Sequence, residues 1–239
     1  MSEFKRADGR ANDEIRPIKA EIHVLKNADG SAYFEMGNTK VIAAVYGPRE
    51  YHPKQLALPQ ESMVRVRYHM IPFSVKERKS PTLSRREIEI SKVIKEAFSG
   101  CIKKELFPKS TIDVYIEVLN ADGSTRVASI NAVSLALVDA GIFMFDLVSA
   151  VSVGKIGNQL IVDLTGEEDQ NSEADMPIAM MPSLNKIVLL QMDGFLTMDE
   201  FNKLLTMGVE AIKKIYEKQK EVIRGSLEYL LKMYGPKKI

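Results

Sequence analysis

The stretch that decides the fold is Ile112-Asp113-Val114-Tyr115-Ile116-Glu117-Val118-Leu119-Asn120-Ala121-Asp122-Gly123-Ser124-Thr125-Arg126. Residues 112–119 have the pattern of a strand, and Asp122-Gly123 predicts a turn. The small and apolar residues from Thr125 to Ala140 then suit a buried helix. The rest of the chain is arranged around this strand, glycine turn and helix.

Strand and helix patterns continue on both sides of this unit without a low-complexity linker. The predicted strands are residues 21–25, 32–36, 39–46, 64–70, 150–153, 160–164 and 187–192. One helix is expected from Ser84 to Gly100, and a long amphipathic helix opens at Thr197. We therefore predict an α+β protein with two strand-rich units, each feeding a helix, in a single domain over residues 1–239. The basic tail after Gly235 is expected to fray.

The bulk composition excludes several classes of protein. Lysine plus arginine (33) nearly balances aspartate plus glutamate (32), so attraction to a polyanion must come from local clusters of charge. The single cysteine, Cys101, has no internal disulfide partner, and its apolar setting favours a buried thiol in a reducing compartment. The sequence contains neither the apolar stretch of a signal peptide nor a membrane-spanning window. The expectation is a cytoplasmic protein with no membrane partner.

The glycine turn can bind an anion, because a helix N-terminus presents unpaired N–H groups and the positive end of the helix dipole. Gly123 allows close approach, and Ser124 and Thr125 add hydroxyl donors. Arg126 offers a guanidinium fork that matches two phosphate oxygens. The alternative is an ordinary turn in which Ser124 caps the helix and Arg126 pairs with a surface carboxylate. Spacing alone leaves both interpretations open.

Two further basic clusters lie before this turn. Strict alternation in residues 64–70 puts Arg65 and Arg67 on one strand face and Tyr68 on the other. Arg85 and Arg86 fall in the first turn of a helix, where the dipole disfavours cations by up to ~1 kcal/mol. A bound anion or a flexible, solvated arginine pair would each accommodate that cost. If the three basic clusters converge, they form a track for RNA.

The candidate acid residues are Asp169 and Asp175. Asp175 lies where an acidic loop re-enters an apolar strand, so partial burial and neighbouring acids can raise its pKa and suit it to general acid catalysis. Asp169 can then help to bind a divalent metal. A solvated turn is the alternative that we favour for Glu167, Glu168 and Asp169. The histidines have no metal-ligand spacing. No nucleophilic side chain has an adjacent base in the sequence, so nothing in it supports hydrolysis through a covalent intermediate.

Six motifs follow one another in order along almost the whole chain. They are Arg6-Ala7-Asp8-Gly9-Arg10 with Glu14-Ile15-Arg16-Pro17, Gly37-Asn38-Thr39-Lys40-Val41 with Tyr46-Gly47-Pro48-Arg49, Val64-Arg65-Val66-Arg67-Tyr68, Ser84-Arg85-Arg86-Glu87, Ala121-Asp122-Gly123-Ser124-Thr125-Arg126 and Glu173-Ala174-Asp175-Met176-Pro177. Together they resemble the RNase PH superfamily, and within it the catalytic RNase PH-like subunit of the archaeal exosome. The small departures, such as Thr165 and the pair Gly123-Ser124, remove no charge from the motifs.

The resemblance implies a fold of two packed βαβ-type halves with mixed sheets and a long C-terminal helix. It also implies a role for each matching residue. Inorganic phosphate, as co-substrate, would be bound by Gly123, Ser124, Thr125, Arg126 and Arg86. RNA would be bound by Arg65, Arg67 and Arg85, with Tyr68 stacking on a base, although alternation puts Tyr68 opposite the arginines. The catalytic set would be Asp175 as general acid, Asp169 and Arg126, with Mg²⁺ at Asp169 and Asp175.

The implied activity is phosphorolytic shortening of RNA from the 3′ end, which releases nucleoside diphosphates and is reversible. The implied partners are single-stranded RNA, a homologous non-catalytic subunit that alternates with this chain in a hexameric ring, and RNA-binding cap subunits. Two alternatives remain open. One is a homohexameric RNase PH that trims the 3′ ends of transfer RNA, and the other is an RNA-binding ring scaffold without turnover.

Overall fold

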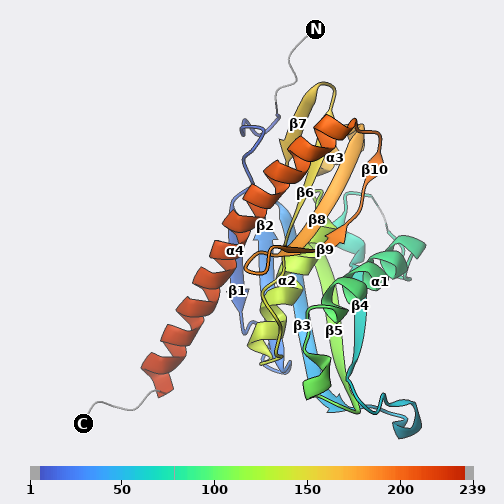
Figure 1. The fold of residues 1–239 in the computed structure, drawn as a ribbon, viewed down its shortest axis with the longest axis vertical. Helices are drawn as coiled ribbons and strands as arrows, with labels where there is room; N and C mark the ends of the chain where they lie inside the picture. The colour runs from blue at the N-terminus through green and yellow to red at the C-terminus, as the bar shows by residue number, and fades with distance from the viewer. Residues whose placement is uncertain (1–5, 78, 235–239) are drawn as a thin grey trace.

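Helix α2 (Thr125–Asp139) lies between two five-stranded sheets in the computed structural model of the protein (Figure 1). The structure describes residues 6–77 and 79–234, with side chains up to residue 228. Because α2 contacts both sheets, it is buried along most of its length, and its small and apolar residues have neighbours on every side. The buried helix predicted after the glycine turn is confirmed.

The first sheet has the strand order β1-β2-β3-β5-β4. Its strands are β1 (Ile18–Ile22), β2 (Gly30–Met36), β3 (Thr39–Glu50), β4 (Met63–Met70) and β5 (Ser110–Asn120). β4 and β5 are parallel, and the crossover between them carries helix α1 (Arg85–Ser99), whereas the other pairs are antiparallel. The strand expected at 21–25 is β1 at Ile18–Ile22, and it ends before His23 because that residue adopts a left-handed φ of 60°.

The second sheet is antiparallel throughout, with the order β10-β8-β6-β7 and with β9 paired to β8. Its strands are β6 (Ser149–Ile156), β7 (Gln159–Val162), β8 (Ala174–Met181), β9 (Lys186–Leu190) and β10 (Asp193–Gly194). The strand that we expected the acidic loop to enter at Asp175 is β8, although it contains a proline. Pro177 is tolerated because its nitrogen and its carbonyl point to the same side of β8. The carbonyl accepts from Gln191 N, so the nitrogen, which has no hydrogen to donate, faces the gap between β9 and β10 and no ladder bond to β6 is lost.

The acidic stretch after β7 is a short helix, α3 (Gly166–Asn171), and not the loop that we expected. Thr165 and Glu168 form a capping box at its start, which explains why these polar residues become helical. The long helix α4 (Met198–Tyr234) packs across β6, β7 and β1, and its far end extends beyond the sheets (Figure 1). The basic tail after Gly235 lies outside the described residues. The remaining elements are three short 3₁₀ helices, η1 (Lys54–Leu56), η2 (Pro72–Ser74) and η3 (Lys104–Leu106).

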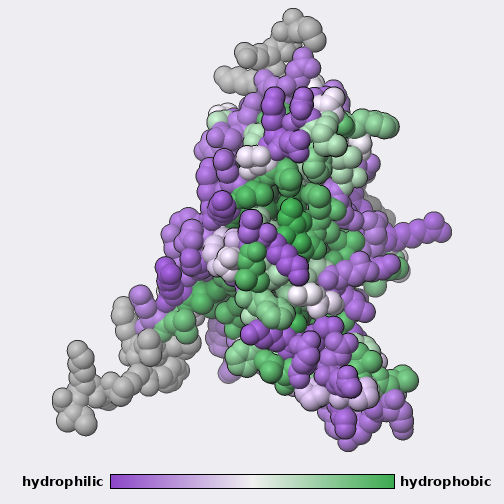
Figure 2. Space-filling view, in the orientation of Figure 1, coloured by the Kyte–Doolittle hydropathy of each residue, from purple (hydrophilic) through white to green (hydrophobic). Residues whose placement is uncertain are grey.

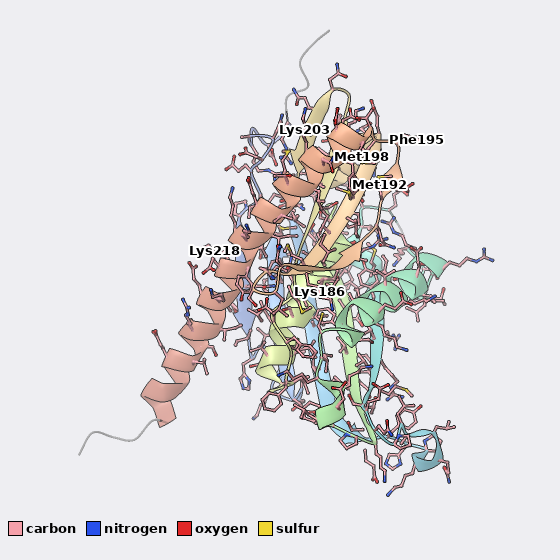
Figure 3. The ribbon with its side chains drawn as sticks, in the orientation of Figure 1. Lys186, Met192, Phe195, Met198, Lys203 and Lys218 are labelled. Carbon is pink, nitrogen blue, oxygen red and sulfur yellow. The ribbon has the colours of Figure 1, made fainter. Side chains whose placement is uncertain are left out.

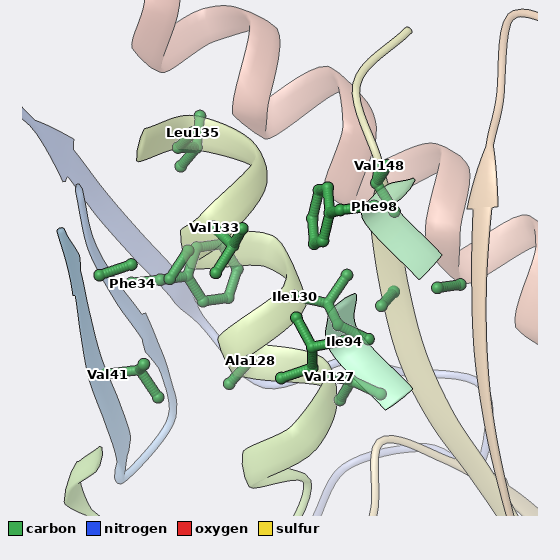
Figure 4. Packing of buried hydrophobic residues seen from close by; sticks show 14 of the residues in the cluster. Phe34, Val41, Ile94, Phe98, Val127, Ala128, Ile130, Val133, Leu135 and Val148 are labelled. Atoms are coloured by element: carbon green, nitrogen blue, oxygen red, sulfur yellow. The ribbon is translucent and has the colours of Figure 1, made fainter. Parts of the chain in front are cut away.

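One continuous group of buried side chains joins the two sheets through α2. Figure 4 shows Phe34 and Val41 of the first sheet facing α2, with Ile94 and Phe98 of α1 on another side of that helix. Cys101 belongs to the same core, so the expected buried thiol is confirmed, and burial raises the pKa of this thiol to about 11. None of the helices within residues 6–77 and 79–234 combines the length and apolar character that crossing a membrane requires.

The face shown in Figure 2 has apolar surface near its middle, where Figure 1 shows β8 and β9. The exposed apolar side chains of β9 and its two flanking turns are Leu184, Ile187, Leu190 and Met192. The loop from β10 to α4 adds Phe195, which is 91% exposed, and Met198. This segment therefore exposes more apolar surface than a short, solvated hairpin needs.

Candidate active site

Two adjoining cavities meet at the N-terminus of α2. The larger has a volume of about 800 Å³ and the smaller about 270 Å³. Both are lined by Arg86, Arg126, Asp169, Asp175 and Pro177. Arg85 and Gln191 line only the larger cavity, while Gly123, Ser124 and Thr125 line only the smaller one. The structure thus brings the glycine turn, the start of α1 and both predicted acids to one place.

Gly123 brings two loops into direct contact. It has a φ of +69°, and a Cβ atom added to it would lie 2.5 Å from the main-chain carbon of Thr165. Glycine is required here because the turn before α2 packs against the loop before α3. We expected Gly123 to allow close approach of an anion, whereas the close approach that the structure records is between two stretches of backbone.

Ser124 differs from both sequence interpretations of its side chain. It has a left-handed φ of 56° and makes no side-chain cap on α2. Its hydroxyl donates to Leu164 O at 2.9 Å. The first turn of α2 therefore has no side-chain cap, and its main-chain N–H groups lie at the smaller cavity. Ser124 can offer an anion its backbone but not its hydroxyl proton.

The structure contradicts the expectation that Tyr68 stacks on a base. Tyr68 is completely buried on the strand face opposite the arginines, as the alternation in β4 predicted. Its hydroxyl donates to Thr125 Oγ1 at 3.1 Å, and burial raises its pKa to about 12, so it remains a donor. Because Thr125 Oγ1 accepts this bond, its own hydroxyl proton is free to point toward the smaller cavity.

Arg126 is only partly satisfied by the protein. Its Nη1 donates to Gln191 Oε1 at 2.5 Å, and its Nη2 lies 4.0 Å from the carboxylate of Glu89. Its Nε is buried and has no hydrogen-bond partner among the described residues. A buried donor without a partner costs free energy, so an acceptor bound in the cavity would stabilise this arrangement. The alternative of a simple surface ion pair accounts poorly for Arg126.

Arg85 and Arg86 begin α1 and face the larger cavity. The capping box predicted at this helix start is confirmed, because Ser84 N donates to Glu87 Oε2 at 2.6 Å and Glu87 N donates to Ser84 Oγ at 3.3 Å. Within the described part of the chain, neither arginine has a carboxylate within 4.0 Å. With Arg126 they face the carboxylates that line the same cavity, which are Glu89, Asp169, Glu173, Asp175 and Asp193, so the cavity holds charges of both signs.

The two acids face these arginines from α3 and β8. Burial raises the pKa of Asp175 to about 6, and the nearby Asp169 carboxylate adds to this effect. The Ser152 hydroxyl donates to Asp175 Oδ1 and opposes the rise by stabilising the ionised form. Burial also raises the pKa of Asp169, against the opposing charges of Arg86 and Arg126. Asp175 therefore has the perturbed pKa that suits a group exchanging a proton near neutral pH.

A metal has limited support from the protein side chains. Nowhere in residues 6–77 and 79–234 do three or more His, Cys, Asp or Glu side chains come together as possible ligands. Asp169 and Asp175 nevertheless face the same cavities. Mg²⁺ is commonly held by one or two carboxylates together with substrate phosphates, so this pair fits that ion.

The third basic cluster does not join the cavities. Arg65 donates to both carboxylate oxygens of Asp113, at 2.5 and 2.6 Å, and lies 5.6 Å from the ring of Tyr51. Arg67 is exposed on the same strand face. Neither residue lines either cavity, so the expected convergence of three basic clusters holds for two of them.

Sequence reasoning missed Gln191, Ser152 and the role of the buried N-terminal arginines. Glu168, expected in a solvated turn, is buried instead and pairs with Arg6 at 2.8 and 2.9 Å. Local patterns carried no signal for these partners, because each lies far along the chain from the residue that it contacts. The N-terminal motif was visible only through its resemblance to a family.

The comparisons with known proteins agree with this geometry. Models of the 3′ exoribonuclease family match residues 14–143 (domain 1) and residues 146–211 (domain 2). Exosome complex component Rrp41 of Pyrococcus abyssi is 56% identical over 220 residues, which are 92% of this chain and 88% of that protein. Rice Rrp46 superposes with a TM-score of 0.83 at 25% identity, over 92% of this chain and 100% of that one. A chain of the Archaeoglobus fulgidus exosome, solved with RNA bound to the active site, superposes with a TM-score of 0.78 at 25% identity, covering 90% and 92%.

Proposed function

Since the chain belongs to the RNase PH family of 3′ exoribonucleases, we propose that it shortens RNA from the 3′ end by phosphorolysis. The observation that carries the proposal is the environment of Arg126. Its buried, unpartnered Nε and the uncapped start of α2 lie beside an acid whose pKa is raised to about 6. This site suits a bound anion together with a proton donor, which are the two requirements of phosphorolysis.

Inorganic phosphate would bind at the start of α2. Its donors would be the main-chain N–H groups of Ser124 and Thr125, the Thr125 hydroxyl and the guanidinium of Arg126. Arg86 lines the same cavity and would neutralise part of the phosphate charge. A phosphate oxygen could then attack the last phosphodiester phosphorus of the RNA.

Asp175 would supply the proton that the departing ribose 3′ oxygen needs. Attack by phosphate forms one phosphorus–oxygen bond and breaks the bond to the 3′ oxygen, so the released product is a nucleoside 5′-diphosphate. The phosphoanhydride bond conserves energy, which makes the reaction reversible and allows added diphosphates to extend RNA. At neutral pH a pKa of about 6 leaves a useful protonated fraction of Asp175.

Arg85, Arg65 and Arg67 would contact the RNA backbone. Arg85 lines the larger cavity, next to the proposed reaction centre. Arg65 and Arg67 lie on the exposed face of β4, so they would contact RNA at a distance from its 3′ end. Mg²⁺, where it is used, would be held mainly by Asp169, because a proton on Asp175 competes with a metal. Bound there, the ion would neutralise charge on the phosphate oxygens.

The chain would act as the catalytic subunit of an archaeal-type exosome ring, alternating with a homologous non-catalytic subunit and covered by RNA-binding cap subunits. The high identity to an archaeal exosome component favours this assembly over a homohexamer that trims transfer RNA. The arginines and aspartates at one cavity favour an enzyme over a scaffold without turnover. The apolar side chains around β9 and the β10–α4 loop, including Met192, Phe195 and Met198 in Figure 3, offer surface for a partner subunit.

The test is RNA decay by the purified chain with its ring partner, with and without inorganic phosphate. Nucleoside diphosphates should appear only when phosphate is present. Arg126→Ala serves as the matched control, because a scaffold would keep its function in that variant whereas the enzyme would lose turnover. Release of monophosphates in the absence of phosphate would refute phosphorolysis.

A further inference from the structure

A buried ion pair between Arg16 and Asp163, outside the cavities, connects the turn before α2 to the loop before α3. Arg16 is 4% exposed and Asp163 is fully buried. Arg16 Nε and Nη2 donate to the two carboxylate oxygens of Asp163, at 2.9 and 2.7 Å, and the main-chain N–H of Arg16 donates to the same group at 2.7 Å. So many matched donors are what a desolvated pair needs to be stable.

From this pair, Arg16 reaches the turn before α2. Its Nη1 donates to Asp122 O at 2.6 Å and approaches Thr39 Oγ1 at 3.4 Å. The Thr39 hydroxyl donates to Gly123 O at 2.8 Å and accepts from Asp122 N at 3.2 Å. Arg16 and Thr39 together therefore hold the main chain of the residues that precede the proposed phosphate site.

From the same pair, Asp163 reaches the proposed general acid. Asp163 N donates to Ser152 O at 2.7 Å, and the Ser152 hydroxyl donates to Asp175. Arg16 Nη2 also donates to Leu164 O at 3.3 Å, which is the carbonyl that accepts from the Ser124 hydroxyl. The pair thus has direct bonds toward both sides of the reaction centre.

We propose that Arg16 is a positioning residue that fixes the phosphate-binding turn relative to the general acid. It touches no substrate in the proposed reaction. It acts through Asp122 and Thr39 on one side and through Asp163 on the other. This inference rests on the proposed function, because it concerns the placement of phosphate against Asp175.

Arg6 provides a matched control. It is 3% exposed and donates to both carboxylate oxygens of Glu168, at 2.8 and 2.9 Å. Its other donors contact the carbonyls of Ala11, Val162 and Asp163, and also that of Glu14 at 3.4 Å. None of these bonds reaches residues 121–124. A lysine at either position keeps the charge but cannot reproduce the guanidinium fork, so the two substitutions disturb stability in a similar way.

The experiment compares Arg16→Lys with Arg6→Lys in the assembled complex. Steady-state kinetics would be measured against inorganic phosphate and against RNA, alongside the melting temperature of each variant. Arg16→Lys should raise the KM for phosphate about tenfold, because displaced main-chain donors would lose about one charge-assisted hydrogen bond to the anion. The KM for RNA should change far less, and Arg6→Lys should leave the KM for phosphate unchanged even if both variants melt earlier.

Thr39→Val keeps the experiment decisive if Arg16→Lys fails to fold. This near-isosteric change removes the bonds to Gly123 and Asp122 but keeps the ion pair of Arg16. It should also raise the KM for phosphate, and an unchanged value would overturn the proposal. Equal increases for Arg16→Lys and Arg6→Lys would overturn it too. If the wild-type complex degrades RNA equally well with and without inorganic phosphate, the proposed function itself is refuted.

Discussion

Replacing Asp175 by asparagine separates its catalytic role from its cost to stability. The carboxylate is partly buried on β8, with its pKa raised from 3.8 to about 6. Asparagine keeps the shape and an oxygen that can accept from Ser152, but it can neither ionise nor donate an acidic proton. We expect turnover to fall by about 10²–10⁴-fold while RNA binding is retained.

The size of the stability change follows from the pKa of Asp175. A rise of about two units corresponds to roughly 3 kcal/mol, and partial exposure to solvent lowers the expected effect to about 1–3 kcal/mol. Because the folded-state pKa is raised, the folded protein holds the Asp175 proton more tightly than the unfolded chain does. The resulting stabilisation is fully present below pH 3.8 and is lost as the pH rises through about 6. Asp175→Asn should therefore be more stable than the wild type at pH 8, and the difference should shrink toward pH 4.

Urea unfolding of the full chain at pH 8 and pH 4 measures this difference directly. RNA binding and RNA decay would be measured on the same two proteins in the complex. A variant that is no more stable than the wild type at pH 8 would contradict the effect of burial on Asp175. Equal loss of RNA binding and turnover would assign Asp175 to binding or folding and remove it as the general acid.

Three further predictions concern neighbouring residues. Ser152→Ala removes a donor to the ionised Asp175 carboxylate, so the pKa of Asp175 should rise further above 6, and a pH–rate profile should show the rate declining at a higher pH. An unchanged profile would exclude Asp175 as the titrating group. Gly123→Ala should destabilise the fold strongly, since its Cβ would lie 2.5 Å from the main-chain carbon of Thr165, and the melting temperature should fall by several degrees. An unchanged melting temperature would refute the tight contact between the turn before α2 and the loop before α3. Arg67→Ala should weaken RNA binding about equally for all sequences, and the slope of log binding constant against log salt concentration should become shallower by about 0.7. Binding titrations at several salt concentrations measure this slope, and a loss restricted to some sequences would instead indicate base recognition.

Local patterns predicted the elements that depend on neighbouring residues in the chain. Alternation in β4 correctly put Arg65 on the exposed face and Tyr68 in the core, and spacing correctly predicted the Ser84–Glu87 capping box. Both features depend on contacts within a few residues. The family resemblance implied a base-stacking role for Tyr68, and its burial shows that the alternation was the better guide.

The rest of the site depends on partners that are distant in sequence. The Ser124 hydroxyl had two open interpretations, a helix cap or an anion donor, but it donates to Leu164 O instead. Glu168 was expected in a solvated turn, but it is paired with Arg6. A strand was expected after Asp175, but its pairing was not, because Pro177 fits in β8 only where its nitrogen, which carries no hydrogen, faces the gap between β9 and β10. In each case the deciding contact forms only once separate segments have packed together.

Inorganic phosphate, bound at the start of α2, is proposed to be the attacking reagent. The most direct test supplies the wild-type complex with isotopically labelled inorganic phosphate and identifies the position of the label in the released nucleotide. We predict that the label appears in the β-phosphate of a nucleoside 5′-diphosphate, with no oxygen incorporated from water. Unlabelled nucleoside monophosphates that carry an oxygen from water would contradict the account.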